Sequence, residues 1–366
     1  MISYSYTLAK PLNNNLNSMR KLIYTACACT FIACGSSQNT VSSNTSTKND
    51  SNIDYAEKYA QTITAKDLGK HLFTYASDEF EGRDTGEPGQ KKAVEYLKNF
   101  YISEGISSPL GGDNYFQKVP SSYLSNNRRG IKLNDSENVV AFIKGTEKPD
   151  EIVVISAHLD HEGVKNGKVY NGADDDGSGT VAILEIAEAF KKAADEGRGP
   201  KRSILFLHVT GEEKGLLGSK YYTENPVFPL ENTVTDLNID MIGRIDARHK
   251  GNPNYVYLIG SDKLSTELHN LSEEVNKKYT NIDLDYKYND ENDPNRFYYR
   301  SDHYNFAKHN IPIIFYFNGT HADYHQPTDT PDRINYELLE NRARLVFLTA
   351  WEVANRDKRL VVDKAQ

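Results

Sequence analysis

Residues 152–160 read IVVISAHLD, residues 172–179 read GADDDGSG and residues 204–213 read ILFLHVTGEE. The first and third segments are continuous apolar runs that end in histidine or acidic side chains. Such a run is typical of a strand that is buried on both faces of a sheet. Because ligands bind beyond the carboxyl ends of strands in open α/β sheets, these segments predict both the fold and the place of its site.

Strand and helix patterns alternate along the rest of the chain. Helical spacing of apolar residues predicts helices that begin at Thr64 and Pro88. This alternation predicts an α/β fold with three layers, α/β/α, around a mixed and mostly parallel central sheet. Strands are predicted at residues 139–143, 152–156, 204–209, 234–239, 255–259 and 312–317, and further helices at residues 178–194, 261–278 and 336–355.

The start of the chain predicts an exported protein with a lipid anchor. Arg20 and Lys21 precede an apolar run over residues 22–33, and Cys34 follows it. A short basic region before about 7–15 apolar residues is typical of a secretory signal. The end of the run, FIACG, resembles the cleavage box of bacterial lipoproteins. Residues 1–34 are therefore predicted to be a signal segment with a lipobox. A lipid on Cys34 would hold the chain to a bacterial envelope membrane, facing the periplasm or the cell surface.

The next stretch, residues 35–52, reads GSSQNTVSSNTSTKNDSN and is predicted to be a flexible tether. Residues 53–363 contain no further linker and are predicted to be one domain. All three cysteines lie before this domain, so any metal site in it must use His, Asp and Glu. The net charge is −8 and no basic stripe is present, which argues against a nucleic-acid partner.

Side chains that bind metals follow four of the predicted strands and precede one helix. Taken singly, each has an ordinary explanation, such as a helix cap or a solvated acidic pair. Together they require five coincidences at one edge of one sheet, which indicates a site. The residues are His158 and Asp160, the run Asp174-Asp175-Asp176, the pair Glu212-Glu213, Asp240, and the pair Tyr324-His325.

The motifs HLD, GADDDGSG, TGEEKGLLGS, NIDMIG and DYHQPTDT occur in this order. They resemble the di-zinc exopeptidase family of bacterial leucyl aminopeptidase and aminopeptidase Y. The similarity covers most of residues 64–355 and includes SDEFEGRDTGEPGQKKA at residues 77–93. The resemblance implies a zinc-dependent exopeptidase architecture over residues 53–363, two Zn²⁺ ions and a peptide substrate. The expected reaction is removal of the amino-terminal residue by a bridging water that the zinc ions activate.

The family pattern also implies a role for each matching residue. Glu212 is expected to be the general base, and the Tyr324 hydroxyl to stabilise the oxyanion. The Asp160 carboxylate is expected to accept the second ring N–H of His158. Bound zinc lowers the pKa of water to about 7, which suits hydrolysis near neutral pH. The expected metal ligands are His158, Asp175, Glu213, Asp240 and His325, with Asp175 bridging both ions.

Other polar residues are secondary candidates. His161 is expected at the pocket rim, and Asp302 either caps a helix or contacts substrate. His208 lies in the middle of an apolar run and is expected in the core. His321 lies near the site but does not match the family ligand. The loop from Asp283 to Arg300 is expected to shape the substrate pocket.

Three alternatives stay open at this point. A carboxypeptidase or dipeptidase of the same family would carry basic residues for a free carboxylate. A glutaminyl cyclase-like acyltransferase would lack the bridging pattern and would carry Trp at position 324. A non-catalytic ectodomain would have lost metal ligands, whereas none of them is substituted here.

Overall fold

The computed structural model describes residues 53–127 and 130–364. The predicted signal segment and tether, residues 1–52, lie outside this part, so both stay predictions. Among the helices of the described residues, none combines the length and the apolar character needed to cross a bilayer.

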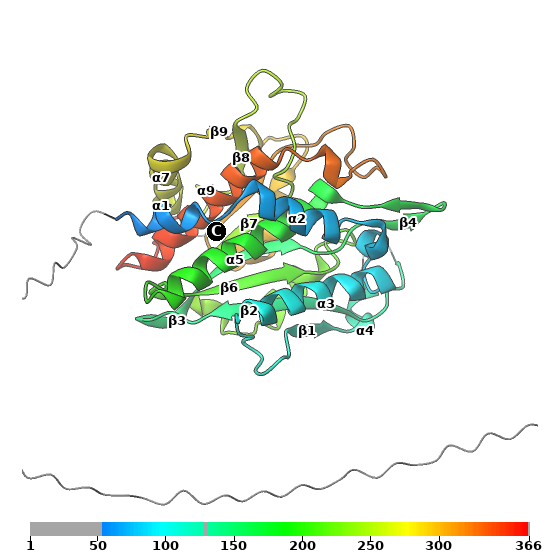
Figure 1. Cartoon of the computed structure of the whole chain (residues 1–366), viewed down its shortest axis with the longest axis horizontal. Helices are drawn as coiled ribbons and strands as arrows, with labels where there is room; N and C mark the ends of the chain where they lie inside the picture. Colours follow the sequence, from blue (N-terminus) through cyan, green and yellow to red (C-terminus); the bar gives the residue numbers. More distant parts are fainter. Residues whose placement is uncertain (1–52, 128–129, 365–366) are drawn as a thin grey trace, which may run out of the picture. The chain divides into compact units, whose positions relative to one another are not determined.

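An eight-stranded mixed sheet forms the centre of the fold (Figure 1). Its strands lie in the order β1-β2-β6-β3-β7-β10-β8-β9. The four central strands, β6, β3, β7 and β10, run parallel to one another. The pairs β1/β2, β2/β6 and β8/β10 are antiparallel, which confirms the predicted mixed and mostly parallel sheet. The strands are β1 Phe116–Val119, β2 Ser136–Ile143, β3 Lys148–His158, β6 Arg202–Val209, β7 Thr233–Ile239, β8 Tyr255–Ile259, β9 Asp283–Asp285 and β10 Ile313–Phe317.

Helices cover both faces of the sheet, as predicted for three layers. Helices α2, α3 and α5 lie across the face turned to the viewer in Figure 1. A separate apolar cluster packs α6 and α8 against the opposite face. The first layer comprises α1 Tyr55–Ala60, α2 Ala65–Tyr75, α3 Pro88–Ser103, α5 Gly179–Asp195, α7 Thr266–Val275 and α9 Tyr336–Asn355. The remaining α-helices and strands of the described residues are α4 Ser121–Leu124, α6 Leu217–Glu224, α8 His303–Ala307 and a small hairpin of β4 Gly163–Lys165 and β5 Lys168–Tyr170.

Strand β3 shows why its sequence is continuously apolar. Val153 and Ile155 pack into the cluster beneath the first helical layer, whereas Ile152 and Val154 pack into the opposite cluster. Successive side chains of a strand point to opposite faces, so a strand covered on both sides needs apolar residues at every position. Each fully buried Val or Ile contributes about 1.5–3 kcal/mol to folding.

Element ends follow local chemistry. The Thr64 side chain accepts a hydrogen bond from the Asp67 N–H at 3.1 Å, which confirms the predicted start of α2. Helix α7 begins at Thr266 rather than at the predicted residue 261, because the chain turns at Gly260 (φ 82°) and Ser265 caps the helix. Strand β10 begins one residue later than predicted, since Pro312 has no N–H to donate to a ladder.

Candidate metal centre

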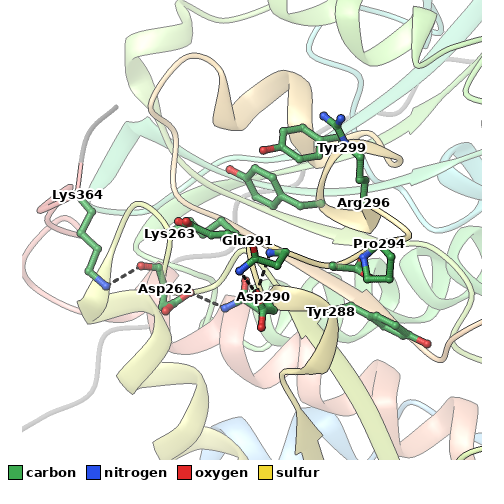
Figure 2. A pocket seen from close by; sticks show the side chains of 13 residues that line it. Asp262, Lys263, Tyr288, Asp290, Glu291, Pro294, Arg296, Tyr299 and Lys364 are labelled. Atoms are coloured by element: carbon green, nitrogen blue, oxygen red, sulfur yellow. Dashed lines mark hydrogen bonds between the residues drawn. The ribbon is translucent and has the colours of Figure 1, made fainter.

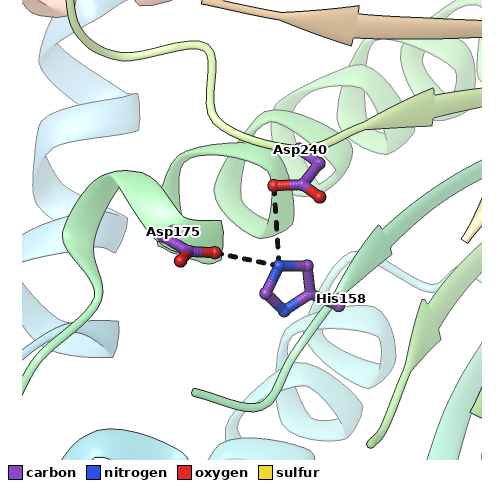
Figure 3. Close-up of side chains that lie close together, drawn as sticks. All are labelled: His158, Asp175 and Asp240. Atoms are coloured by element: carbon purple, nitrogen blue, oxygen red, sulfur yellow. Dashed lines mark ion pairs between the residues drawn. The ribbon is translucent and has the colours of Figure 1, made fainter. Parts of the chain in front are cut away.

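The carboxyl ends of β3 and β7 and the helical turn Ala173–Ser178 before α5 bring one group of ligands together (Figure 3). The His158 Nε2 atom lies 3.1 Å from Asp175 Oδ1 and 3.6 Å from Asp240 Oδ1. All three side chains are buried. This group combines one imidazole with two carboxylates, and each of these residues was predicted as a ligand.

A second group forms around the other oxygen of Asp175. The His325 Nε2 atom lies 3.0 Å from Asp175 Oδ2 and 3.3 Å from Glu213 Oε2. Asp175 therefore faces one group with each carboxylate oxygen, which is the arrangement of a bridging ligand. The structure brings all five predicted ligands together at one edge of the sheet.

The contacts within these groups fit ligands that converge on shared ions. His158 Nε2 lies close to carboxylate oxygens of Asp175 and Asp240, and Asp175 Oδ2 lies close to His325 Nε2. Neither His158 Nε2 nor Asp175 Oδ2 makes an aligned hydrogen bond. Asp175 and Glu213 outweigh the effect of burial and raise the pKa of His325 to about 10, which shows a strongly negative local field. Imidazole nitrogen and carboxylate oxygen are suitable ligands for zinc. The residues present therefore fit two divalent ions.

The tautomer of His158 is fixed by a backbone group. Its Nδ1 lies 3.0 Å from the carbonyl oxygen of Asp160, which can only accept, so Nδ1 carries the proton and Nε2 is left for a metal. The predicted contact with the Asp160 carboxylate was wrong, because Oδ1 lies 4.0 Å from Nδ1. Strand β3 ends at His158, so the alternation of an extended chain does not continue to residue 160.

The Asp160 carboxylate instead connects two other segments. It accepts hydrogen bonds from the Thr85 hydroxyl at 2.7 Å and from the Glu212 N–H at 3.1 Å. Asp160 therefore positions the backbone of Glu212, the predicted base, rather than the ring of His158. Thr85 was not among the predicted site residues, although it lies within the matched segment 77–93.

Only the middle residue of the aspartate run points into the centre. Asp174 accepts hydrogen bonds from the Gly243 N–H and from Asn318, and it contacts His321 at 3.0 Å. Asp176 accepts from the N–H groups of His158, Gly179 and Met241. The flanking aspartates thus tie loops together, and the Asp175–Asp176 peptide bond is cis.

Two residues that the sequence analysis missed hold these loops in place. The Asp329 carboxylate accepts hydrogen bonds from the N–H groups of Asp174 and Asp175. The buried Arg83 guanidinium donates to the carbonyl oxygens of Leu159 and Asn171, and also to those of Tyr75 and Gly172. Arg83 therefore joins the loop after β3 to the loop before α5. The only sequence signal for this role was that Arg83 lies in residues 77–93, which resemble the di-zinc exopeptidase family.

Glu212 and Tyr324 line the cleft beside the ligands. Burial, together with the carboxylates of Glu213 and Asp240, raises the pKa of Glu212 well above its usual value. A carboxylate with a raised pKa holds a transferred proton more readily. The Tyr324 ring stacks on the His325 ring with 4.0 Å between centroids. His325 has a φ of 55°, a strained conformation of the kind that is concentrated at functional sites.

Apolar side chains and one cation complete the cleft. Phe297, Phe315 and Phe317 line it together with Met241, and Arg300 lies at its exposed side. The Arg300 guanidinium stacks over the Phe297 ring at 4.8 Å and donates to the Tyr324 hydroxyl at 3.4 Å. The loop that supplies Phe297 and Arg300 also lines a neighbouring cavity of about 910 Å³ (Figure 2). The predicted contribution of this loop to the pocket is confirmed.

The secondary candidates have different positions. His208 is buried in the core, as expected, with its Nε2 at 2.7 Å from the Tyr101 hydroxyl. Asp302 makes no cap; it is fully buried and accepts a hydrogen bond from Ser219. His161 is not at the rim as predicted but fully buried, because the loop before α5 covers it at Gly172.

Comparisons with known proteins extend these observations. A sequence profile of peptidase family M28 matches residues 138–350. Leupeptin-inactivating enzyme 1 of Streptomyces exfoliatus is 29% identical over 254 residues, which are 69% of this chain and 48% of that protein. The chain thus spans about half the length of this relative.

Solved structures show the same fold. LapB of Legionella pneumophila has a TM-score of 0.64 at 21% identity, covering 82% of this chain and 75% of that chain. BSAP, a zinc aminopeptidase from Bacillus subtilis, has a TM-score of 0.60 at 16% identity, covering 83% of this chain and 99% of that chain.

Proposed function

Because the chain belongs to peptidase family M28, we propose that it is a metal-dependent aminopeptidase that hydrolyses the amino-terminal peptide bond of its substrate. One observation carries this proposal. The Asp175 carboxylate faces two ligand groups at once, and Glu212 and Tyr324 lie in the same cleft. A bridging carboxylate beside a general base and a hydroxyl donor is the arrangement that hydrolysis of a peptide needs.

The proposed metal is zinc at both positions. His158, Asp175 and Asp240 would hold one ion. Asp175 and Glu213, which both lie close to His325 Nε2, would hold the other together with His325. When bound, two zinc ions would lower the pKa of a shared water and polarise the carbonyl group that is cleaved. The similarity to a zinc aminopeptidase from Bacillus subtilis supports this choice of metal.

Glu212 is proposed to move the proton. Its side chain lies in the cleft while its backbone N–H is bound by Asp160, so the carboxylate is presented from a fixed main chain. The carboxylate would take a proton from the attacking water and deliver it to the nitrogen of the leaving amine.

Tyr324 is proposed to stabilise the negative charge that develops on the carbonyl oxygen. Its ring is fixed against His325, and its hydroxyl lies within the cleft beside Arg300. Burial and the neighbouring carboxylates raise the pKa of Tyr324, so the hydroxyl keeps its proton and can donate it in a hydrogen bond.

A second candidate is an exopeptidase that recognises a free carboxylate, and Arg300 favours it. The Arg300 side chain is exposed at the cleft, where it contacts the Tyr324 hydroxyl and the Phe297 ring and, among the described residues, no carboxylate at ion-pair distance. A guanidinium in this position can bind the carboxyl terminus of a short peptide. Dipeptides and longer peptides therefore need to be compared directly.

The test is hydrolysis of leucyl-p-nitroanilide beside its N-acetylated form, with metal content measured on the same sample. Activity on the free-amine substrate alone, with loss on chelation, is expected. Activity restricted to peptides with a free carboxyl terminus would move the assignment to the second candidate. Cleavage of the N-acetylated substrate at an equal rate would exclude an aminopeptidase.

The chain is further proposed to be exported and lipid-anchored through Cys34. The basic residues before an apolar run and the cysteine that follows support this proposal. Expression in a bacterial host with a labelled fatty acid is expected to label the wild-type chain and not Cys34→Ala. Equal labelling of the two chains would exclude Cys34 as the acceptor.

A further inference from the structure

His161 lies against the second ligand group without belonging to the predicted ligand set. Its Nδ1 is 2.9 Å from Glu213 Oε1 and 3.7 Å from Asp175 Oδ2. Its ring makes an edge contact with the His325 ring, with centroids 5.7 Å apart. A buried imidazole is thus directed at the two carboxylates that define the second group.

His161 Nδ1 and Glu213 Oε1 lie at the distance of an ion pair but are not aligned as a hydrogen bond. The side chain of His161 is fully buried, and neither of its ring nitrogens makes one. A buried polar atom without a hydrogen bond costs free energy unless another group satisfies it. Close approach without hydrogen-bond alignment is what atoms show when they converge on a third point.

His158 provides an internal comparison. Its Nε2 lies 3.1 Å and 3.6 Å from two carboxylate oxygens and also makes no hydrogen bond. The corresponding distances of His161 Nδ1 are 2.9 Å and 3.7 Å. In its distances to two carboxylate oxygens, His161 Nδ1 therefore matches His158 Nε2.

The surrounding chain is shaped to hold this ring. A Cβ atom on Gly172 would lie 2.2 Å from the Asp175 carbonyl oxygen and 2.4 Å from His161 Cγ, so glycine at residue 172 leaves room for both the turn and the ring. The His161 N–H donates to the carbonyl oxygen of Arg83 at 3.2 Å, which fixes the backbone on the other side. Arg83 also donates to the carbonyl oxygens of Leu159 and Gly172, so it ties the loop of His161 to the segment that covers the ring.

We propose that His161 is a further protein ligand of the second metal ion. This inference rests on the two ions of the proposed function. The second ion would then have His161, Asp175, Glu213 and His325, whereas the first has His158, Asp175 and Asp240. Because the second ion has one more imidazole ligand, it is retained longer when a chelator removes the two ions in steps.

The first test compares His161→Phe with His208→Phe. Both replace a fully buried histidine by a ring of similar size, but His208 contacts no predicted ligand. Metal-free full-length protein is titrated with Zn²⁺ against a chromogenic chelator, and the thermal midpoint is recorded without metal. Loss of an outer hydrogen-bond partner of a ligand costs about 10–100-fold in metal affinity.

For a direct ligand, His161→Phe is expected to weaken one of the two ions by more than this range, while His208→Phe leaves both affinities unchanged. Unchanged binding in His161→Phe, or a loss of about 10–100-fold only, overturns the proposal. If the wild-type chain binds no ion, the proposed function fails with it, so the two failures are distinguishable.

A second measurement needs no variant and so does not depend on folding of His161→Phe. In the Co²⁺-substituted wild-type protein, NMR signals of imidazole rings bound to the ion are strongly shifted. Three histidines with such shifts are expected, namely His158, His161 and His325. Two shifted histidines would overturn the assignment.

Discussion

At the scale of single residues, Asp175 differs from Asp174 and Asp176 because its two carboxylate oxygens each face a group of metal-binding side chains. The carboxylates of Asp174 and Asp176 accept hydrogen bonds from backbone N–H groups, whereas the Asp175 carboxylate faces both ligand groups. The ligand types and their strands could be predicted because chemistry and sheet topology constrain them. The loop that a given carboxylate binds could not be predicted. Asp160, for example, accepts a hydrogen bond from the Glu212 N–H and not from the His158 ring.

The role of Glu212 is testable by a change that removes its charge and keeps its shape. Glu212→Gln is expected to bind both ions and keep its fold but to lose about 10²–10⁴-fold in kcat, because the proton acceptor is gone. Steady-state hydrolysis of leucyl-p-nitroanilide and metal analysis measure both properties. Glu213→Gln serves as the matched control, since it is expected to lose metal as well. A fully active Glu212→Gln enzyme would refute the assignment.

Tyr324 is expected to act on the transition state rather than on substrate binding. Tyr324→Phe should lower kcat by about 10²–10³-fold with little change in KM, since one hydrogen-bond donor to the oxyanion is removed. Tyr299→Phe is the control, because Tyr299 is exposed and lies outside the metal cleft. A change in KM alone would assign Tyr324 to substrate binding instead.

At the scale of elements, the strands could be predicted closely because burial on both faces leaves a clear apolar pattern. Strand β8 and helix α9 have the predicted bounds, and the predicted family is confirmed by the profile match. The β4–β5 hairpin and the start of α7 were missed, since short exposed strands and tight turns depend on contacts from distant segments. The role of Arg83 was missed for a similar reason. Its partners are backbone carbonyl groups, which every residue has, so no side-chain pattern in the sequence indicates them.

Arg83 connects the loop after β3 to the loop before α5, and this connection can be tested. Arg83→Met should lower the free energy of unfolding by about 2–5 kcal/mol, because buried carbonyl groups lose their donor. It should also weaken metal binding, since the loops carrying His158 and Asp175 are no longer tied. Arg202→Met is the control, as Arg202 is equally buried and binds carbonyl groups of Val353 and Arg356.

Denaturant unfolding and zinc titration measure these two effects. Both variants are expected to be destabilised, and only Arg83→Met to bind metal more weakly. Equal metal affinity in the two variants would mean that Arg83 supports the fold without shaping the centre.

At the scale of the whole molecule, buried histidines make stability depend on pH. Burial lowers the pKa of His208 to about 3 from an ordinary value of 6.5. The unfolded chain therefore binds a proton that the folded chain excludes, so stability is present above pH 6.5 and is lost as the pH falls toward 3. His208→Phe should make this loss shallower by up to about 1.4 kcal/mol per pH unit. The free energy of unfolding is measured against pH for both proteins. Equal slopes between pH 3 and pH 6.5 would contradict the prediction.

The proposed hydrolysis depends on two metal ions that share Asp175 and lie beside Glu212. The most direct measurement is to remove all metal from the purified protein and add Zn²⁺ back in small steps while following hydrolysis of leucyl-p-nitroanilide. We expect no hydrolysis without metal and a rise in rate that reaches its plateau at two ions per chain. Full activity in the metal-free protein, or a chain that binds no zinc, would contradict it.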